Sequence, residues 1–205
     1  MIINGQTISK IMYNGQGINK ALFNNIIAYQ KQEEESSVLF YDDFNINGGL
    51  STPWQSIDGD LSLWEKANGY LYYKGTSGTS PLVAVDVGTS NVIFTVKYGL
   101  TKGNHRTMFR VIDASTYWYL WLSGGYRLYK NSSLKASGGV ASAGDEIKVI
   151  LNGTSIKVYK NSILLFDVTD DDPQLGNKFG IKVESLSTTT PTNTQFDYVK
   201  IEKVT

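Results

Sequence analysis

The sequence predicts an all-β protein in which two antiparallel sheets pack as a sandwich. Short runs rich in β-branched and aromatic residues recur along the chain, and turns rich in Gly, Asn and Ser separate them. From residue 38 onward, no apolar residues keep a helical spacing over about ten residues. The chain also holds only 4 Pro. Many short, evenly spaced strands joined by such turns indicate a two-sheet antiparallel fold.

Composition and charge limit the classes of function. With 205 residues, of which 41% are hydrophobic and 12% aromatic, the chain suits one large domain or an ordinary domain with an appendage. Its 19 basic residues balance its 19 acidic ones, so no net field attracts nucleic acid or an anionic membrane. We therefore expect no nucleic-acid partner and no membrane insertion. There is no Cys, which excludes disulfides and thiolate metal sites.

The N-terminus, beginning Met1-Ile-Ile-Asn, lacks a basic region followed by an apolar segment, and no run of about 18 apolar residues occurs. We expect synthesis in the cytosol without an ordinary signal sequence. A function outside the cell would then need another exit route.

A short motif recurs every ten residues within residues 1–30, with Asn4-Gly5, Asn14-Gly15 and Asn24-Asn25 each between apolar residues. Asn-Gly in this setting is a strong hairpin signal, because both residues tolerate positive φ. We predict a ladder of short strands that turn at these pairs. About thirty residues of this kind bury little surface alone. Two alternatives stay open: a hairpin packed on the main domain, or a segment for attachment or oligomerisation, for instance as a homotrimer.

Residues 31–37 are polar and lack apolar anchors, which predicts a linker. The main domain is then expected at residues 38–205. Within it, Trp64 precedes the turn pair Asn68-Gly69, and we expect this indole to be half-buried against a sheet.

The segment from Thr107 to Lys130 predicts a three-stranded meander, because Asp-Ala-Ser and Ser-Gly-Gly separate three aromatic and β-branched runs. Side chains alternate across a strand, so each run has two faces. One face is expected in the core: Phe109, Val111, Trp118, Leu120, Leu122 and Leu128. The other face is expected to carry rings with two guanidinium groups: Arg110, Tyr117, Tyr119, Trp121, Arg127 and Tyr129. Such rings suit stacking on the apolar faces of sugars, while Arg donates to their hydroxyl groups.

Several short marks between residues 38 and 205 resemble, in their order, concanavalin A-like (laminin-G-like) jelly rolls. The marks are Asp42-Asp43-Phe44, Leu63-Trp64 through Leu71, Met108-Phe-Arg-Val, Gly144-Asp145-Glu-Ile-Lys-Val, Lys160-Asn-Ser-Ile-Leu-Leu, Gly180-Ile and Phe196-Asp-Tyr-Val-Lys-Ile201. The resemblance implies two stacked sheets, one of them concave, with the first and last strands adjacent at one edge. The repeats of residues 1–30 resemble N-terminal segments of structural proteins from tailed bacteriophages.

Together the two resemblances imply an accessory or adhesion protein of a phage tail, baseplate or capsid, assembled in the host cytoplasm and acting extracellularly in the virion. The jelly roll would bind host cell-wall polysaccharide, and residues 1–30 would contact other phage structural proteins. The residues expected to bind the polysaccharide are Trp121, Tyr119, Arg110, Tyr117, Arg127 and Tyr129.

Two alternatives to adhesion remain. The first is a decoration protein of head or tail, whose sheet face packs on a neighbouring subunit and binds no glycan. The second is a glycan-cleaving enzyme, since some members of this fold are glucanases in which two Glu flank an Asp on one strand. That pattern is missing from the sequence, and glycoside hydrolysis ordinarily needs two positioned carboxylates. We therefore expect no enzyme activity.

No cofactor is expected, and a structural calcium ion is left open. Asp170-Asp171-Asp172 offers clustered carboxylates for a hard cation, yet it also fits a solvated turn ended by Pro173. Asp43 and Asp197 form a second option, since the resemblance brings the end strands together. His105, the only histidine, is expected to lie exposed in a loop without partners for a relay or a transition-metal site.

Overall fold

The computed structural model describes the backbone of six short strands between residues 2 and 30, and of residues 37–74, 81–101, 104–171, 176–184 and 194–204. Side chains are described for residues 37–74, 81–99, 105–171, 176–183 and 195–204. The chain divides into two compact units, Met1–Ser36 and Ser37–Thr205. Each unit has its own sheets.

The described strands of the first unit form two-stranded antiparallel hairpins, which confirms the predicted hairpin segment. The pairs are β1 (Ile2–Ile3) with β2 (Gln6–Thr7), β3 (Ile11–Tyr13) with β4 (Gln16–Ile18), and β5 (Lys20–Phe23) with β6 (Ile26–Gln30). The predicted turn pairs fall between the paired strands and, like residues 31–36 of the predicted linker, lie outside the described residues. Attachment and oligomerisation by this unit stay predictions.

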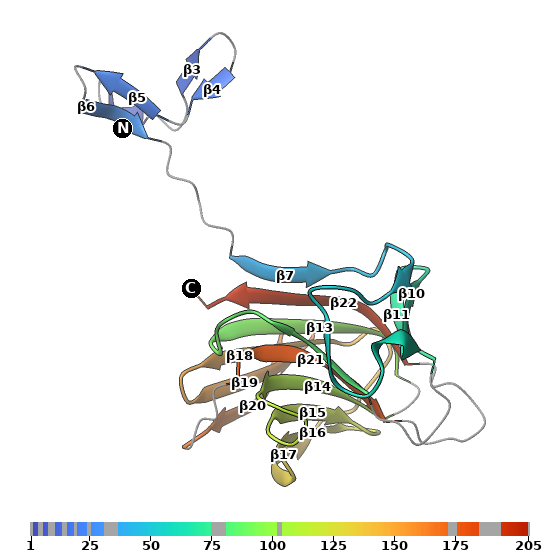
Figure 1. Ribbon diagram of the computed structural model, residues 1–205. Coiled ribbons are helices and arrows are strands. Elements are labelled where there is room, and N and C mark those ends of the chain that lie inside the picture. The colour runs from blue at the N-terminus through green and yellow to red at the C-terminus, as the bar shows by residue number, and fades with distance from the viewer. Residues whose placement is uncertain are drawn as a thin grey trace. The chain divides into compact units, whose positions relative to one another are not determined.

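The second unit is a sandwich of two antiparallel sheets, as the sequence predicts (Figure 1). The larger sheet has nine strands in the order β20-β19-β18-β13-β22-β11-β10-β8, and β7 also pairs with β22. Its strands are β7 (Val38–Asp42), β8 (Gly48–Gly49), β10 (Trp64–Ala67), β11 (Tyr70–Tyr73), β13 (Val92–Thr101), β18 (Glu146–Asn152), β19 (Ser155–Lys160), β20 (Ile163–Thr169) and β22 (Thr194–Lys203). The pairing of β7 with β22 brings the first and last strands of the unit together, as the jelly-roll resemblance implied.

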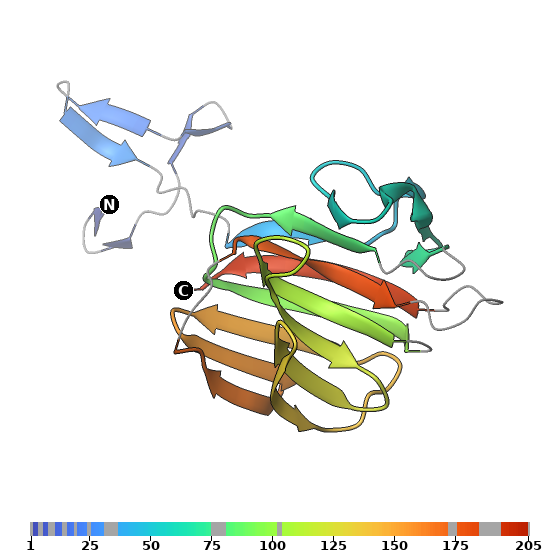
Figure 2. The ribbon, with the colours of Figure 1, turned by 60° about the horizontal axis from the view of Figure 1, so that its bottom comes forward.

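The smaller sheet has seven strands in the order β17-β16-β15-β14-β21-β12-β9, stacked on the first (Figure 2). Its strands are β9 (Gln55–Asp58), β12 (Leu82–Asp86), β14 (Asn104–Val111), β15 (Trp118–Leu122), β16 (Tyr126–Lys130), β17 (Ser133–Gly138) and β21 (Lys178–Glu184). The predicted meander corresponds to β14, β15 and β16. Helical structure in the described residues is limited to the 3-10 turn Leu61–Leu63, and no helix there is long and apolar enough to cross a membrane.

Aromatic side chains from both sheets fill the space between them. Phe94 on β13 meets Phe179 on β21 edge to face, with ring centroids 5.5 Å apart. Trp118 is buried beside Phe109, which confirms the predicted place of this indole in the core. The prediction of a half-buried Trp64 is wrong. This indole is fully buried, because the ring of Tyr73 packs at 5.5 Å.

The prediction that His105 lies exposed in a loop is also wrong. β14 begins at Asn104, so His105 is a strand residue whose side chain points into the sandwich and is 0% exposed. Its ring lies 4.7 Å from that of Tyr98 and 5.8 Å from that of Phe196. The pairing of β13 with β22 supplies both neighbours, and a local reading of the sequence does not show that pairing.

Candidate functional site

The outer face of the seven-stranded sheet carries the predicted rings on neighbouring strands. We call the set formed by Tyr117, Tyr119, Trp121, Tyr129, Arg106 and Arg127 the aromatic face. Its residues lie in two cross-strand rows. In one row Trp121 on β15 stands between Arg127 on β16 and Arg106 on β14. In the next row Tyr119 stands between Tyr129 and Met108.

The rings of the aromatic face contact one another directly. Tyr119 and Tyr129 stack with centroids 4.9 Å apart and planes 7° from parallel. Tyr117 meets Tyr119 edge to face at 5.7 Å, and Trp121 lies 6.1 Å from Tyr129. The direct cross-strand pair of Tyr119 and Tyr129 stabilises the sheet, and the neighbouring rings pack around it. The face is therefore a preformed platform.

Two guanidinium groups lie over these rings. The Arg106 guanidinium carbon is 4.4 Å from the Tyr119 centroid and 5.6 Å from that of Trp121. The Arg127 guanidinium carbon is 5.5 Å from the Trp121 centroid. Both distances to Trp121 are within the range of cation–π attraction. Trp121 is thus flanked by a cation on each side.

Exposure differs across the aromatic face. Tyr119 is only 5% exposed, because Arg106 and the neighbouring rings cover it. Tyr117, Trp121 and Tyr129 are half-buried, and Arg127 is exposed. Leu134 on β17, opposite Tyr129, is 52% exposed and extends the apolar area toward the sheet edge. A ligand would therefore meet the β15–β17 side of the face, with Tyr119 as a support beneath it.

The predicted place of Arg110 on this face is wrong. The pairing of β14 with β21 shifts register between Met108 and Val111, and Arg110 has a φ of +51°. A strand with one extra residue turns the following side chains to the opposite face. Val111, predicted in the core between the sheets, consequently packs beside Met108 on the outer side. Arg110 points the other way and is 0% exposed.

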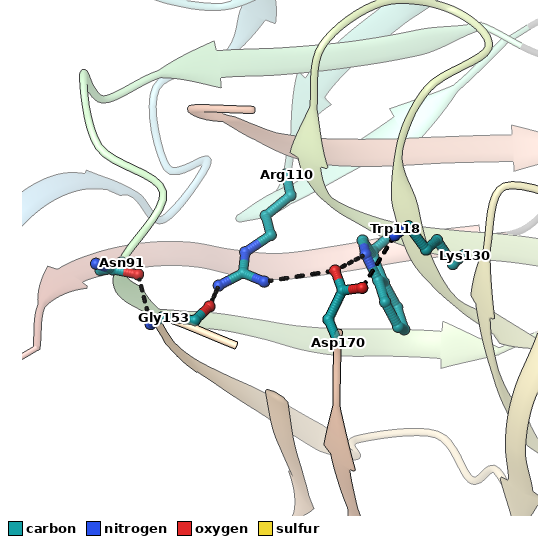
Figure 3. Close-up of polar contacts among 6 residues, drawn as sticks. All are labelled: Asn91, Arg110, Trp118, Lys130, Gly153 and Asp170. Atoms are coloured by element: carbon teal, nitrogen blue, oxygen red, sulfur yellow. Dashed lines mark hydrogen bonds and ion pairs between the residues drawn. The ribbon is translucent and has the colours of Figure 1, made fainter. Parts of the chain in front are cut away.

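Arg110 instead belongs to a polar network at one end of the sandwich (Figure 3). Its Nη2 donates to the carbonyl oxygen of Gly153 at 2.5 Å, and its Nη1 is 3.9 Å from Asp170. Burial lowers the pKa of the Arg110 guanidinium, and the charge of Asp170 opposes that shift. Trp118 and Lys130 donate to the same carboxylate, at 3.0 Å and 2.9 Å. This network stabilises the fold and does not reach the aromatic face.

Arg106 is the member of the aromatic face that the sequence prediction missed. The alternation that puts Phe109 in the core also puts Arg106 and Met108 on the opposite face, three and one residues before it. Alternation alone therefore places Arg106 on the correct face, because the register shift lies C-terminal to it. Arg110 lies within the shifted segment, so alternation placed it on the wrong face.

Of the calcium candidates in the described residues, Asp170 and Asp197 already face cations, whereas Asp171 is exposed. Asp170 is buried and faces Lys130 and Arg110, so it belongs neither to a solvated turn nor to an open acidic cluster. Asp197 pairs with Lys97 at 2.9 Å, and the hydrogen bond and charge of Asp197 raise the pKa of the Lys97 amine. Asp43 accepts a hydrogen bond from the backbone of Asn45. In the described residues, no three His, Asp or Glu side chains gather where they could hold a metal ion.

Carboxylates are also missing from the outward-facing described positions of β14, β15 and β16. These positions hold Arg106, Met108, Val111, Tyr119, Trp121, Arg127 and Tyr129. Asp58 on β9 lies in the row of Arg106, two strands beyond Lys182 on β21, and its carboxylate is 4.0 Å from Lys182 Nζ. The face can therefore stack and donate hydrogen bonds, but its centre has no acid–base pair.

Comparison with solved structures identifies the class of fold. No protein-family model and no curated protein sequence matches the chain. Among solved structures it is similar to the carbohydrate binding module CBM66 from Bacillus subtilis, with a TM-score of 0.50, 14% identity, and coverage of 74% of this chain and 96% of that one. It is also similar to SCLam, a non-specific endo-beta-1,3(4)-glucanase from family GH16, with a TM-score of 0.60, 11% identity, and coverage of 82% and 91%.

A third similar structure is LamAcat from Zobellia galactanivorans, with a TM-score of 0.52, 14% identity, and coverage of 82% of this chain and 98% of that one. At these identities the likeness defines the class of fold. The chain is a jelly-roll β-sandwich of the kind that carbohydrate-binding modules and GH16 proteins share.

Proposed function

We propose that the chain binds polysaccharide through the aromatic face and has no enzyme activity. The observation that carries the proposal is Trp121, a half-buried indole held in register between two guanidinium groups. The apolar faces of sugar rings stack on such an indole while guanidinium groups donate to the ring substituents. The similarity to a carbohydrate binding module supports this reading.

The finer proposal is an adhesion protein of a bacteriophage virion that binds the host cell surface. It rests on the resemblance of residues 1–30 to phage structural proteins and on the separate compact unit that these residues form. This unit would attach the chain to other phage proteins or join it as a homotrimer, and the jelly roll would act extracellularly. Single glycan sites bind weakly, so many copies on one particle would raise the overall affinity.

A decoration protein is the second candidate, and the exposed side chain of Leu134 beside Tyr129 favours it. An apolar surface of this kind also suits a neighbouring subunit. A glycan-cleaving enzyme is the third candidate, favoured by the similarity to a GH16 glucanase. The outward positions of β14, β15 and β16 supply no carboxylate for it.

One experiment separates these candidates. Cell-wall polysaccharide is presented to the full chain, to Trp121→Ala, and to Tyr41→Ala as a control. Tyr41 is 53% exposed on β7 of the other sheet, so its loss removes an exposed ring without touching the aromatic face. We expect binding by the full chain and the control and its loss in Trp121→Ala, with unchanged circular dichroism. Absence of binding by all three proteins favours decoration, and release of reducing sugar supports the enzyme.

The mass of the protein in solution tests whether the first unit oligomerises the chain. Light scattering compares the full chain with a variant that begins at Ser37. A trimer that becomes a monomer on removal of residues 1–36 supports oligomerisation. Two monomers contradict it and leave attachment as the role.

A further inference from the structure

A row that contains three cations runs from the aromatic face across four neighbouring strands in register. Arg127 on β16 is opposite Trp121, Trp121 is opposite Arg106, and Arg106 is opposite Lys182 on β21. Neighbouring strands are about 4.8 Å apart, so the three cations lie along about 14 Å of the sheet. This length corresponds to a few sugar units of an extended polysaccharide.

The row has an excess of positive charge. Against its three cations stand Asp58 at the far edge, 4.0 Å from Lys182 Nζ, and Glu184, two residues beyond Lys182 on β21. Arg127 is exposed, and no carboxylate of the described residues lies within ion-pair distance of its guanidinium. In the adjacent part of the face, Lys178 donates to the carbonyl oxygen of Ile112 and lies opposite Asp86 on β12, so these two residues add no net charge. A ligand at Trp121 therefore meets a positive local field, although the whole chain has no net charge.

The charged groups beside Trp121 are donors only, while the Tyr129 hydroxyl can donate or accept. A neutral sugar hydroxyl both donates and accepts hydrogen bonds, so a site for neutral sugars gains from Asp, Glu or Asn acceptors. Arg106 and Arg127 accept nothing. A carboxylate, phosphate or sulfate accepts only, and guanidinium groups bind such oxyanions through paired N–H donors.

We infer that the polysaccharide bound by the aromatic face is anionic. This inference rests on the proposed glycan binding at Trp121. The sugar ring stacks on Trp121 and Tyr129, and its acidic group lies against Arg127 and Arg106. Uronic acids, phosphodiester-linked sugars and sulfated sugars share this chemistry.

The central comparison is between two polymers that share a backbone and differ in charge. Polygalacturonate and its fully methyl-esterified form have the same backbone, and a glycerol-phosphate polymer and a sulfated galactan represent the other two oxyanions. The full chain is titrated with each at low salt. We expect at least one anionic polymer to bind about tenfold more tightly than the neutral ester. The preference should shrink as NaCl rises from about 0.05 M to about 0.5 M, because surface charges are screened.

Variants identify the groups responsible. We expect Arg127→Gln to lower affinity for the preferred anionic polymer about fivefold to tenfold and to lower affinity for the neutral ester less, so that the anionic preference shrinks. Lys97→Gln is the matched control, since Lys97 lies on β13 in the other sheet and pairs with Asp197. Its binding should equal that of the unmodified chain.

The outcomes distinguish this inference from the proposed function. Equal binding of charged and neutral polymers, abolished by Trp121→Ala, overturns the anionic inference and leaves glycan binding in place. An anionic preference that Arg127→Gln does not reduce also overturns it. Binding to no polymer and to no cell wall overturns both.

Discussion

The carboxylate of Asp170 accepts a hydrogen bond from the indole Nε1 of Trp118 at 3.0 Å, across 52 residues of sequence. Asp170 follows β20 in the nine-stranded sheet, and Trp118 begins β15 in the seven-stranded one. Lys130 and Arg110, both from the second sheet, face the same carboxylate at 2.9 Å and 3.9 Å. Arg110 also donates to Gly153, in the turn between β18 and β19. One buried anion thus joins the two sheets at this end.

The first prediction is that Asp170→Asn lowers the free energy of unfolding by about 3 kcal/mol. The substitution keeps the shape of the side chain but leaves Arg110 buried beside Lys130 without a counter-charge. Urea unfolding followed by Trp fluorescence measures the change. Asp167→Asn is the control, because its ion pair with Lys157 is exposed and should change stability by less than about 0.5 kcal/mol. Equal effects of the two substitutions would contradict a structural role for the network.

The second prediction separates the two arginines that the sequence placed together. Arg110→Gln should lower the free energy of unfolding by about 2 kcal/mol, since Asp170 and the Gly153 carbonyl lose a buried partner. It should leave polysaccharide binding unchanged. Arg127→Gln should weaken polysaccharide binding and leave the free energy of unfolding within about 0.5 kcal/mol of that of the unmodified chain. Urea unfolding and polysaccharide titration of both variants measure this, and a binding defect in Arg110→Gln would contradict the assignment.

Local patterns were sufficient for the strands and most of the core. Alternation placed Trp118, Leu120, Leu122 and Leu128 correctly, because β15 and β16 pair without a register shift. The turn at Asn68-Gly69 was equally readable, since both residues have positive φ and both types tolerate it. These features depend on residues within one hairpin, which is the range that sequence alternation covers.

The errors arose where distant strands decide the outcome. Arg110 has positive φ without being Gly, Asn or Asp, so no residue type marks the shift that turns it inward. His105 is buried because Tyr98 and Phe196 meet on other strands. Asp170 was expected in a solvated acidic run, but in the fold Trp118, Lys130 and Arg110 surround its carboxylate. Apart from Tyr98, seven residues before His105, these partners are distant in sequence.

The third prediction concerns the close approach of β21 to β12. A Cβ on Gly180 would lie 2.6 Å from the Cα and 2.8 Å from the Cβ of Ala84, and against the carbonyl oxygen of Val83. These are mostly backbone atoms, so Gly180→Ala must push two paired strands apart. We expect it to lower the free energy of unfolding by at least about 2 kcal/mol. Thermal unfolding measures the loss. Gly49→Ala is the control, because its Cβ would meet only the Trp64 carbonyl oxygen at 3.9 Å, and an unaffected Gly180→Ala would contradict the packing argument.

The fourth prediction concerns stability against pH at Asp145, which sits before β18. Burial raises the pKa of this carboxyl, but hydrogen bonds from Tyr126, Ser142, Lys160 and Asn161 outweigh burial and lower the pKa below its ordinary value. The Tyr126 hydroxyl and the Ser142 amide donate at 2.6 Å and 2.7 Å. Because the folded pKa lies below the unfolded one, the unfolded chain takes up the proton first as the pH falls. The stabilisation is therefore complete above the unfolded pKa, about 3.9, and is lost as the pH falls through the folded value.

Asp145→Asn removes this titration and makes the effect measurable. The variant should be less stable than the unmodified chain at pH 7, because a neutral amide replaces the carboxylate beside Lys160, 3.1 Å away. Below about pH 4 the gap should narrow, since protonation of Asp145 removes the same charge from the unmodified chain. Other carboxyl groups titrate in both proteins and cancel in the difference. Urea unfolding of the pair between pH 7 and pH 2.5 gives this difference directly, and a gap that stays constant or widens toward low pH would mean that the Asp145 pKa is not lowered by folding.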